Sequence, residues 1–166
     1  MIALAQKIDE LIEPLRRLSD KALSPLLDLG IRLFTADIFL GSGWLKFKNF
    51  LDGNWDTTVY LFREVHIVPV VSPELAAFLG TGAEIVLPVL LIAGLFTRFS
   101  AAGLLIMTAV IQFAVFDSFG DDLSNPDHYM WMLLLAVPLI KGAGVLSLDH
   151  LVLKYLRKGE ENKEKP

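Results

Sequence analysis

One acidic residue, Glu84, interrupts an apolar segment that is long enough to cross a lipid bilayer. The segment runs from Glu74 to Phe96. About 20 predominantly apolar residues span a bilayer, and an ionisable side chain near the middle costs at least ~2.5 kcal/mol. Ala76 and Gly80 precede Glu84 at four-residue spacing, and such small residues let a neighbouring helix approach closely. We therefore predict that Glu84 faces other helices rather than lipid and has a polar partner there.

The composition is typical of a membrane protein. Of 166 residues, 54% are hydrophobic and only 20% are charged, and the mean hydropathy is +0.53. The chain has no cysteine, which excludes disulfides, thiolate ligation of iron–sulfur clusters and thiol catalysis within it. The net charge of −4 argues against a nucleic-acid partner. The three histidines lack the spacing of metal ligands, so no metal site is expected.

Four segments reach membrane-spanning length, so we predict an all-α membrane protein built as a bundle of four transmembrane helices with an N-terminal amphipathic helix. The candidate spans are residues 26–47, 74–96, 99–116 and 129–148. Together they define a transmembrane domain at residues 26–150. A charged cytoplasmic tail at residues 151–166 is predicted to follow it.

Residues 1–25 are predicted to form the amphipathic helix. Apolar residues recur there at helical spacing, opposite four charged residues, Lys7, Glu10, Arg17 and Lys21. The helix either lies on the membrane surface or packs its apolar face against the bundle. Pro14 is expected to kink or divide it.

The distribution of lysine and arginine predicts the orientation in the membrane. These residues gather in segments 1–25 and 151–166, and Arg98 lies in the turn between the second and third spans. The loop at residues 117–128 has four aspartates and no lysine or arginine. Because basic segments remain on the cytoplasmic side, both termini of this multi-pass protein are predicted to be cytoplasmic.

Three polar side chains are predicted to lie at one depth. Counted from the cytoplasmic helix ends, Asp37, Glu84 and Gln112 are about 11 to 13 residues in, which differ by only ~3 Å at the helical rise. If these side chains converge, they form a proton-binding or quinone-facing layer. Arg32 either joins this layer or is an anchor in an i,i+4 ion pair with Asp28. Gln112 is either a ligand group or a hydrogen-bonding contact between helices.

Other polar and aromatic residues lie near the predicted membrane boundaries. His128 and Trp131 open the fourth span, where they form either an aromatic belt or the rim of a quinone site. Lys46, Arg98 and Asp149 stand at helix ends, where each is most simply explained as an interface anchor or a cap.

Several short motifs, in this order, resemble those of the DoxX family of small membrane proteins. They are Arg32 in the first helix, Gly41-Ser-Gly-Trp-Leu-Lys46 at its end, Gly82-Ala-Glu84, Gly94-Leu-Phe-Thr-Arg98, and Gly142-Ala-Gly-Val-Leu-Ser-Leu-Asp149. The resemblance covers residues 26–150. It implies a four-helix membrane domain similar to the small subunit of thiosulfate:quinone oxidoreductase, in the inner membrane of a bacterium.

The resemblance also implies a function, a membrane subunit of a quinone-linked oxidoreductase system that works with a membrane or membrane-associated protein partner. Under this hypothesis the catalytic candidates are Glu84, Arg32 and Asp37. The candidates for contact with a quinone cofactor are Gln112, His128, Trp131, Lys46 and Arg98. The alternative hypothesis is a non-enzymatic transporter of a small solute or a membrane scaffold. The sequence leaves open whether the chain is itself catalytic and whether it forms a homo-oligomer.

Overall fold

The protein is helical in the computed structural model, which describes residues 2–116, 119 and 124–163. The only extended pairing among these residues is an antiparallel bridge between Ile67 and Phe116. In chain order the helices are α1 (Ile2–Leu18), the π-helical η1 (Ser19–Leu23), α2 (Ser24–Leu51), α3 (Trp55–Glu64), α4 (Pro73–Ala93), α5 (Thr97–Ala114), α6 (Pro126–Lys141) and α7 (Leu148–Lys163). The predicted all-α class is confirmed for the described residues.

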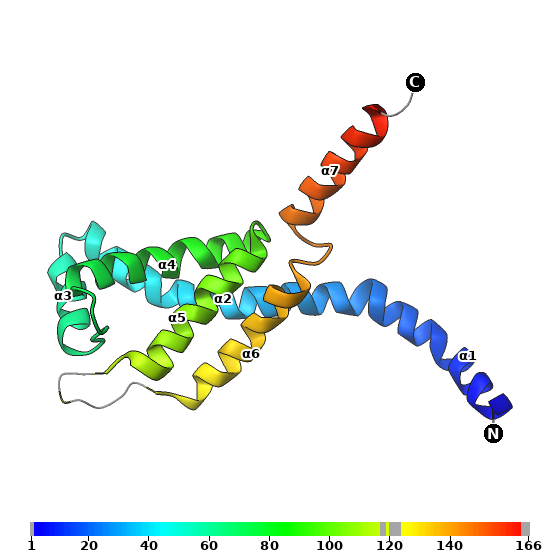
Figure 1. Ribbon diagram of the computed structural model, residues 1–166, viewed down its shortest axis with the longest axis horizontal. Helices are drawn as coiled ribbons and strands as arrows, with labels where there is room; N and C mark the ends of the chain where they lie inside the picture. Colours follow the sequence, from blue (N-terminus) through cyan, green and yellow to red (C-terminus); the bar gives the residue numbers. More distant parts are fainter. Residues whose placement is uncertain (1, 117–118, 120–123, 164–166) are drawn as a thin grey trace.

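Four of these helices, α2, α4, α5 and α6, pack side by side and form what we call the bundle (Figure 1). α2 lies against α4, α4 against α5, α5 against α6, and α6 against α2. The apolar centre of the bundle consists of small and branched side chains and one phenylalanine: Ala36, Phe39, Leu91, Ala101, Leu104 and Leu135. In a membrane, the close packing of these side chains, rather than their removal from water, holds the helices together.

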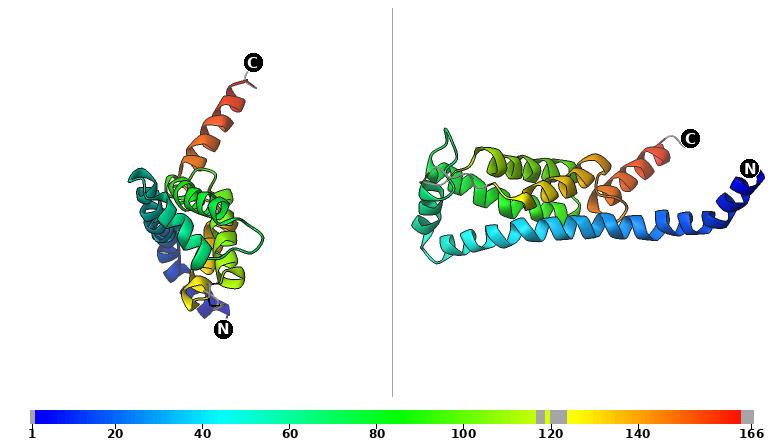
Figure 2. Two further views of the ribbon diagram at one scale, coloured as in Figure 1. Left: turned by 90° about the vertical axis from the view of Figure 1, so that its left-hand side faces the viewer. Right: turned by 90° about the horizontal axis from the view of Figure 1, so that it is seen from below.

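The two ends of the bundle differ. α3 and residues 65–72 lie at one end, which we call the cavity end (Figure 1). The α4–α5 turn and residues 142–147 lie at the other, which we call the clamp end. The chain enters and leaves the bundle at the clamp end, so both termini are on the same side of it (Figure 2).

Among the described residues, two helices are long and apolar enough to cross a membrane. α4 has a mean hydropathy of 2.1 and α5 of 1.4 over the most apolar stretch of each. α2 does not qualify because it carries five charged residues, Asp28, Arg32, Asp37, Lys46 and Lys48. α6 has only 16 residues. Of the four predicted spans, α4 and α5 have the length and composition of a membrane span, and α2 and α6 do not.

Local capping explains where the bundle helices begin and end. Ser72 accepts a hydrogen bond from the Leu75 N–H at the start of α4, directly before Pro73. α4 ends at Gly94, which has a φ of 66°. α6 ends at Lys141, not at residue 148 as predicted, because Gly142 has a φ of 85° and turns the chain away.

The N-terminal segment forms one continuous helical path with α2 (Figure 2). α1 runs through Pro14 without ending there, and η1 follows at Ser19–Leu23. The predicted helix is therefore present. It projects away from the bundle and leaves Leu11 and Leu15 exposed, so its apolar face does not pack against the bundle.

Three predicted segments either differ from the structure or lie partly outside the described residues. The connection between the first two spans contains the helix α3, which was not predicted, and the charged tail is helical as α7 as far as residue 163. Most of the acidic loop predicted to face outward, residues 117, 118 and 120–123, lies outside the described residues, as do residues 164–166 of the tail.

Candidate functional site

A glycine brings α2 and α4 into close contact next to Glu84. A Cβ atom placed on Gly43 would lie 2.7 Å from the Cβ of Glu84 and 2.9 Å from its carbonyl oxygen. No other residue type has room at this position without a shift of the helices. The motif Gly41-Ser-Gly-Trp-Leu-Lys46 is therefore a point of close helix packing, and this packing determines which side chains meet.

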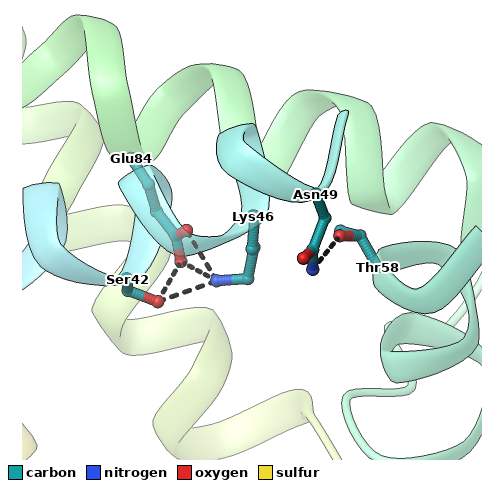
Figure 3. A network of polar contacts seen from close by, with 5 residues as sticks. All are labelled: Ser42, Lys46, Asn49, Thr58 and Glu84. Carbon is teal, nitrogen blue, oxygen red and sulfur yellow. Dashed lines mark hydrogen bonds and ion pairs between the residues drawn. The ribbon is translucent and has the colours of Figure 1, made fainter. Parts of the chain in front are cut away.

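A buried ion pair lies directly beside this contact (Figure 3). The Lys46 ammonium donates to both carboxylate oxygens of Glu84, with Nζ to Oε2 and Oε1 distances of 2.6 and 2.8 Å. It also donates to the Ser42 hydroxyl at 2.8 Å. The side chains of Lys46 and Glu84 are only 10% and 9% exposed. The polar partner predicted for Glu84 is thus a lysine of α2.

The Lys46–Glu84 pair borders a cavity of about 600 Å³ at the cavity end. Most of the cavity wall is apolar, and residues of α2, α3, α4, α5 and α6 contribute to it. Its polar lining consists of Ser42, Lys46, His66, Glu84 and His128, and Phe62 and Trp131 provide aromatic faces. A largely apolar pocket with a few converging polar groups is the usual form of a small-molecule site.

α3 and the segment after it cover the cavity. Phe62 packs on α4 where Gly80 has no side chain, and a Cβ there would lie 2.9 Å from the ring. The Lys46 ammonium lies 5.9 Å from the centre of the same ring, within range of a cation–π interaction. The bridge between Ile67 and Phe116 ties the covering segment to the end of α5.

His66 is the least satisfied polar group of the cavity. Its Nδ1 atom is buried and has no hydrogen-bond partner among the described residues. Burial, together with the positive charge of Lys46, lowers the pKa of His66 below its ordinary value of 6.5. His66 is therefore a neutral imidazole near pH 7, with a ring nitrogen that can bond to a ligand in the cavity.

His128 enters the cavity wall from the start of α6. Its Nδ1 lies 2.7 Å from the Gln112 side-chain oxygen, which also accepts the Asn125 N–H at 2.9 Å. The His128 ring lies 5.0 Å from that of Trp131, centre to centre. Gln112 thus acts as a contact between α5 and α6 and holds His128 in place, and it does not itself line the cavity.

Arg32 lies far from Glu84, at the clamp end. It is 1% exposed, and its guanidinium donates to the main-chain carbonyls of Leu91, at 3.2 Å, and of Leu146. It therefore joins the end of α4 to the segment that follows α6. Arg32 and Lys46 are on similar faces of α2, but 14 residues correspond to about 21 Å along a helix, so Arg32 cannot reach Glu84.

The other predicted charges also lie elsewhere. Asp37 is exposed, because nine residues separate it from Lys46 and place it roughly 180° around α2. Asp28 does not pair with Arg32 as the spacing predicted, but with Lys141 of α6 at 2.6 Å. Arg98 is exposed and donates to the Ile140 carbonyl at the clamp end. The layer of Asp37, Glu84 and Gln112 predicted from depth is not formed.

Asp149 has a definite structural role at the clamp end. Its carboxylate accepts the Phe96 N–H at 2.9 Å and the Thr97 N–H at 3.0 Å, at the first turn of α5. The Asp149 N–H donates to the Gly94 carbonyl at 2.8 Å. The prediction of a cap is therefore right in kind, but the capped helix is α5 and not the helix that contains Asp149.

Lys46 was not recognised from sequence as the partner of Glu84. The first span was predicted to end at residue 47, which put Lys46 at the membrane boundary, but α2 continues to Leu51. Lys46 is therefore more than one turn inside the helix. The signal that could have found it is the pair of glycine-rich motifs before Lys46 and Glu84, since each marks a close approach of helices.

Comparison with known proteins identifies the family. The family model named DoxX matches residues 27–117, which is more than half of the chain. The chain belongs to the DoxX family. The resemblance predicted from the motifs is thereby confirmed, and the protein is a membrane protein of that family. The closing motif at residues 142–149 lies beyond the matched region.

An uncharacterised protein of Haemophilus influenzae is similar to this DoxX protein. The two are 28% identical over 127 residues, which cover 75% of this chain and 82% of the relative. No solved structure gives a significant match. The matched family region contains the motifs around Lys46 and Glu84 and the α4–α5 turn.

Proposed function

We propose that this DoxX protein is a membrane subunit of a quinone-linked redox system and that its cavity binds the quinone ring. The observation that carries the proposal is the cavity of about 600 Å³ with apolar walls, bordered by the Lys46–Glu84 pair and two histidines. A quinone is an apolar ring with two carbonyl oxygens that accept hydrogen bonds. When bound, it supplies a carrier of two electrons and two protons.

The residues of the cavity fit such a ring. Lys46 lies at the cavity wall, where its three ammonium donors bond to Glu84 and Ser42, and one of them would turn to a ring carbonyl when the ring is bound. His66 has an unpartnered ring nitrogen for a second hydrogen bond. The remaining wall, which includes Phe39, Ile106 and Met107, is suited to an apolar ring and tail. Glu84 and the histidines can hold protons close to the ligand.

The same proposal places four helices in the membrane. α2 and α6 pack along α4 and α5, so they share the depth of the two helices that qualify as spans. Basic residues concentrate at the clamp end: Arg16, Arg17, Arg98, Lys141, Lys154, Arg157 and Lys158. By the bias of such residues, this end and both termini face the cytoplasm of a bacterial inner membrane. The chain has no cysteine, so under this proposal electrons arrive through a bound cofactor or a partner protein and not through thiol groups of the chain.

Binding of a short-tail quinone to the protein in lipid nanodiscs tests the proposal. Trp131 lines the cavity, so in a variant that keeps it as the single tryptophan (Trp44→Phe, Trp55→Phe) a bound quinone should quench its fluorescence with a saturable dependence on concentration. Lys46→Met should weaken this binding at least about tenfold, which corresponds to the loss of one charge-assisted hydrogen bond.

Lys48→Met is the matched control, because Lys48 is exposed two residues further along α2. It should leave quinone binding unchanged. Quenching that does not saturate, or that is equal in Lys46→Met and Lys48→Met, would reject the cavity as a quinone site. Flux of a solute or of protons through reconstituted liposomes that stops in Glu84→Gln would favour transport instead.

A further inference from the structure

Among the described residues, the last helix, α7, contacts the bundle through its first turn. The Asp149 carboxylate holds the first turn of α5, and the Ser147 hydroxyl accepts the His150 N–H at 3.1 Å. After this turn α7 leaves the bundle (Figure 1), and every side chain of residues 151–159 is exposed. A helix of this length is marginal in water without a packed face. The described residues of the bundle offer α7 no packed face.

The exposed part of α7 has two different faces. At 100° per residue, one face of roughly 140° is apolar and consists of Leu148, Leu151, Val152, Tyr155 and Leu156. Their exposure is substantial, with 58% for Leu151 and 81% for Tyr155. His150, Lys154 and Arg157 lie on the other side of the helix, and Lys158 lies at the edge of the apolar face; with Leu153 these residues line a shallow groove. Such a division is typical of helices that lie in a membrane interface.

The position of α7 and the charge of its basic side both indicate the same binding partner for its exposed faces. α7 begins beside the turn between α4 and α5, the two helices that qualify as membrane spans, so its first turn lies where those spans end. The connecting residues 142–147 include Gly142 and Gly144, both with positive φ, which lets the chain turn there. The basic face complements anionic lipid phosphates, and the apolar face complements acyl chains.

We propose that α7 lies on the membrane surface and binds anionic phospholipids. Its apolar face enters the boundary between head groups and acyl chains. Lys158 and Lys154 lie nearest the edge of that face and pair with the phosphates, and the long Arg157 side chain reaches toward them from the far side. The helix then anchors the clamp end to an anionic leaflet, independently of any ligand in the cavity.

A fluorescent label on a single cysteine tests this proposal, because the native chain has none. Leu151→Cys carries the label on the apolar face, and His150→Cys carries it on the basic face as the matched control. In nanodiscs of phosphatidylcholine with phosphatidylglycerol, the label at residue 151 should resist quenching by iodide, and the label at residue 150 should remain accessible. In phosphatidylcholine alone, the protection at residue 151 should fall.

Charge removal is the second measurement. Each basic residue is then replaced in the Leu151→Cys background, by Lys154→Gln, Arg157→Gln or Lys158→Gln. Each substitution should lower the ratio of iodide-protected to iodide-accessible label roughly fivefold in the anionic nanodiscs. The control Lys48→Gln, at the cavity end of α2, should leave this ratio unchanged. An accessible label at residue 151 in both lipid mixtures would overturn the proposal. So would protection that is equal in both mixtures and unaffected by the three substitutions, since a protein partner would then cover the helix.

Discussion

The clamp end and the cavity end of the bundle contain similar ionisable side chains but bond them differently. At the clamp end, Arg32 and Asp149 bond to main-chain groups that lie at helix ends. At the cavity end, Lys46 and Glu84 bond mainly to each other and border a space of about 600 Å³. The clamp end therefore fixes the chain, and the cavity end leaves side chains that a ligand can engage.

This difference shows that the partner of a buried charge indicates its role better than its depth does. A main-chain carbonyl at a helix end needs a donor in every state of the protein, so the residue that supplies it is structural. A side-chain pair can share its hydrogen bonds with a bound molecule. By this criterion Arg32 is a positioning residue of the fold, and Glu84 and Lys46 are candidates for function.

The largest effect is expected from breaking the Lys46–Glu84 pair on one side only. Lys46→Met leaves the Glu84 carboxylate buried without its partner, which should lower the free energy of unfolding by about 3–5 kcal/mol. The double variant Lys46→Met, Glu84→Met replaces both charges with apolar groups and should recover most of this loss. Denaturant unfolding in detergent micelles, followed by circular dichroism, measures both effects. Equal stability of the single and double variants would show that the pair is not coupled.

Arg32→Met should lower the free energy of unfolding by about 1–3 kcal/mol, because the Leu146 carbonyl loses its Arg32 donor and the Leu91 carbonyl keeps only the Gly94 N–H. A second substitution can compensate the loss in the Lys46–Glu84 pair, but none can do so for Arg32→Met, because the acceptors there are main-chain carbonyls. The exposed Arg98 is the control, and Arg98→Met should cost less than about 1 kcal/mol. Quinone binding per folded molecule should be unchanged in Arg32→Met. If binding were lost from folded Arg32→Met protein, the separation of the two ends would fail.

Gly43 and Gly41 provide a sharper comparison within one helix. Gly43→Ala places a methyl group against the main chain of Glu84, and overpacking of this kind costs about 1–3 kcal/mol. It should also displace the Lys46–Glu84 pair and weaken quinone binding. Gly41 has open space around it, so Gly41→Ala should be neutral or stabilise α2 by up to about 1 kcal/mol. Thermal unfolding of the two variants side by side measures the difference, and equal melting temperatures would show that α2 and α4 do not approach at Gly43.

The sequence predicted the helical class, the family and the approximate positions of α2, α4, α5 and α6 because these depend on apolar runs and local caps. Ser72-Pro73 and Gly94, for example, mark the ends of α4 in the sequence itself. It also predicted that Glu84 is directed at another helix, from the small residues before it. α3 and the helical form of α7 were missed because both segments are short or strongly charged.

The candidate site was predicted only in part, because depth along a helix does not define direction around it. Asp37 matches Glu84 in depth but lies on the opposite face of α2 from Lys46. The sequence allows Arg32 to be either an anchor or a site residue, because its carbonyl partners lie far away in the chain, at separations of 59 and 114 positions. No local pattern specifies such contacts. They depend on how α2, α4 and the segment after α6 pack together.

The smallest effect is expected from pH acting on His66. Burial and the charge of Lys46 lower the His66 pKa in the folded protein, whereas the unfolded chain titrates near 6.5. Below that pH the unfolded state binds more protons, so the free energy of unfolding should fall as the pH drops from 7 toward about 5. His66→Gln should reduce this fall by less than about 1 kcal/mol, because the ring is only partly buried and solvent screens it. The exposed His150 gives the control variant His150→Gln, which should keep the parent slope. A slope that His66→Gln leaves unchanged would show that His66 does not carry the pH dependence.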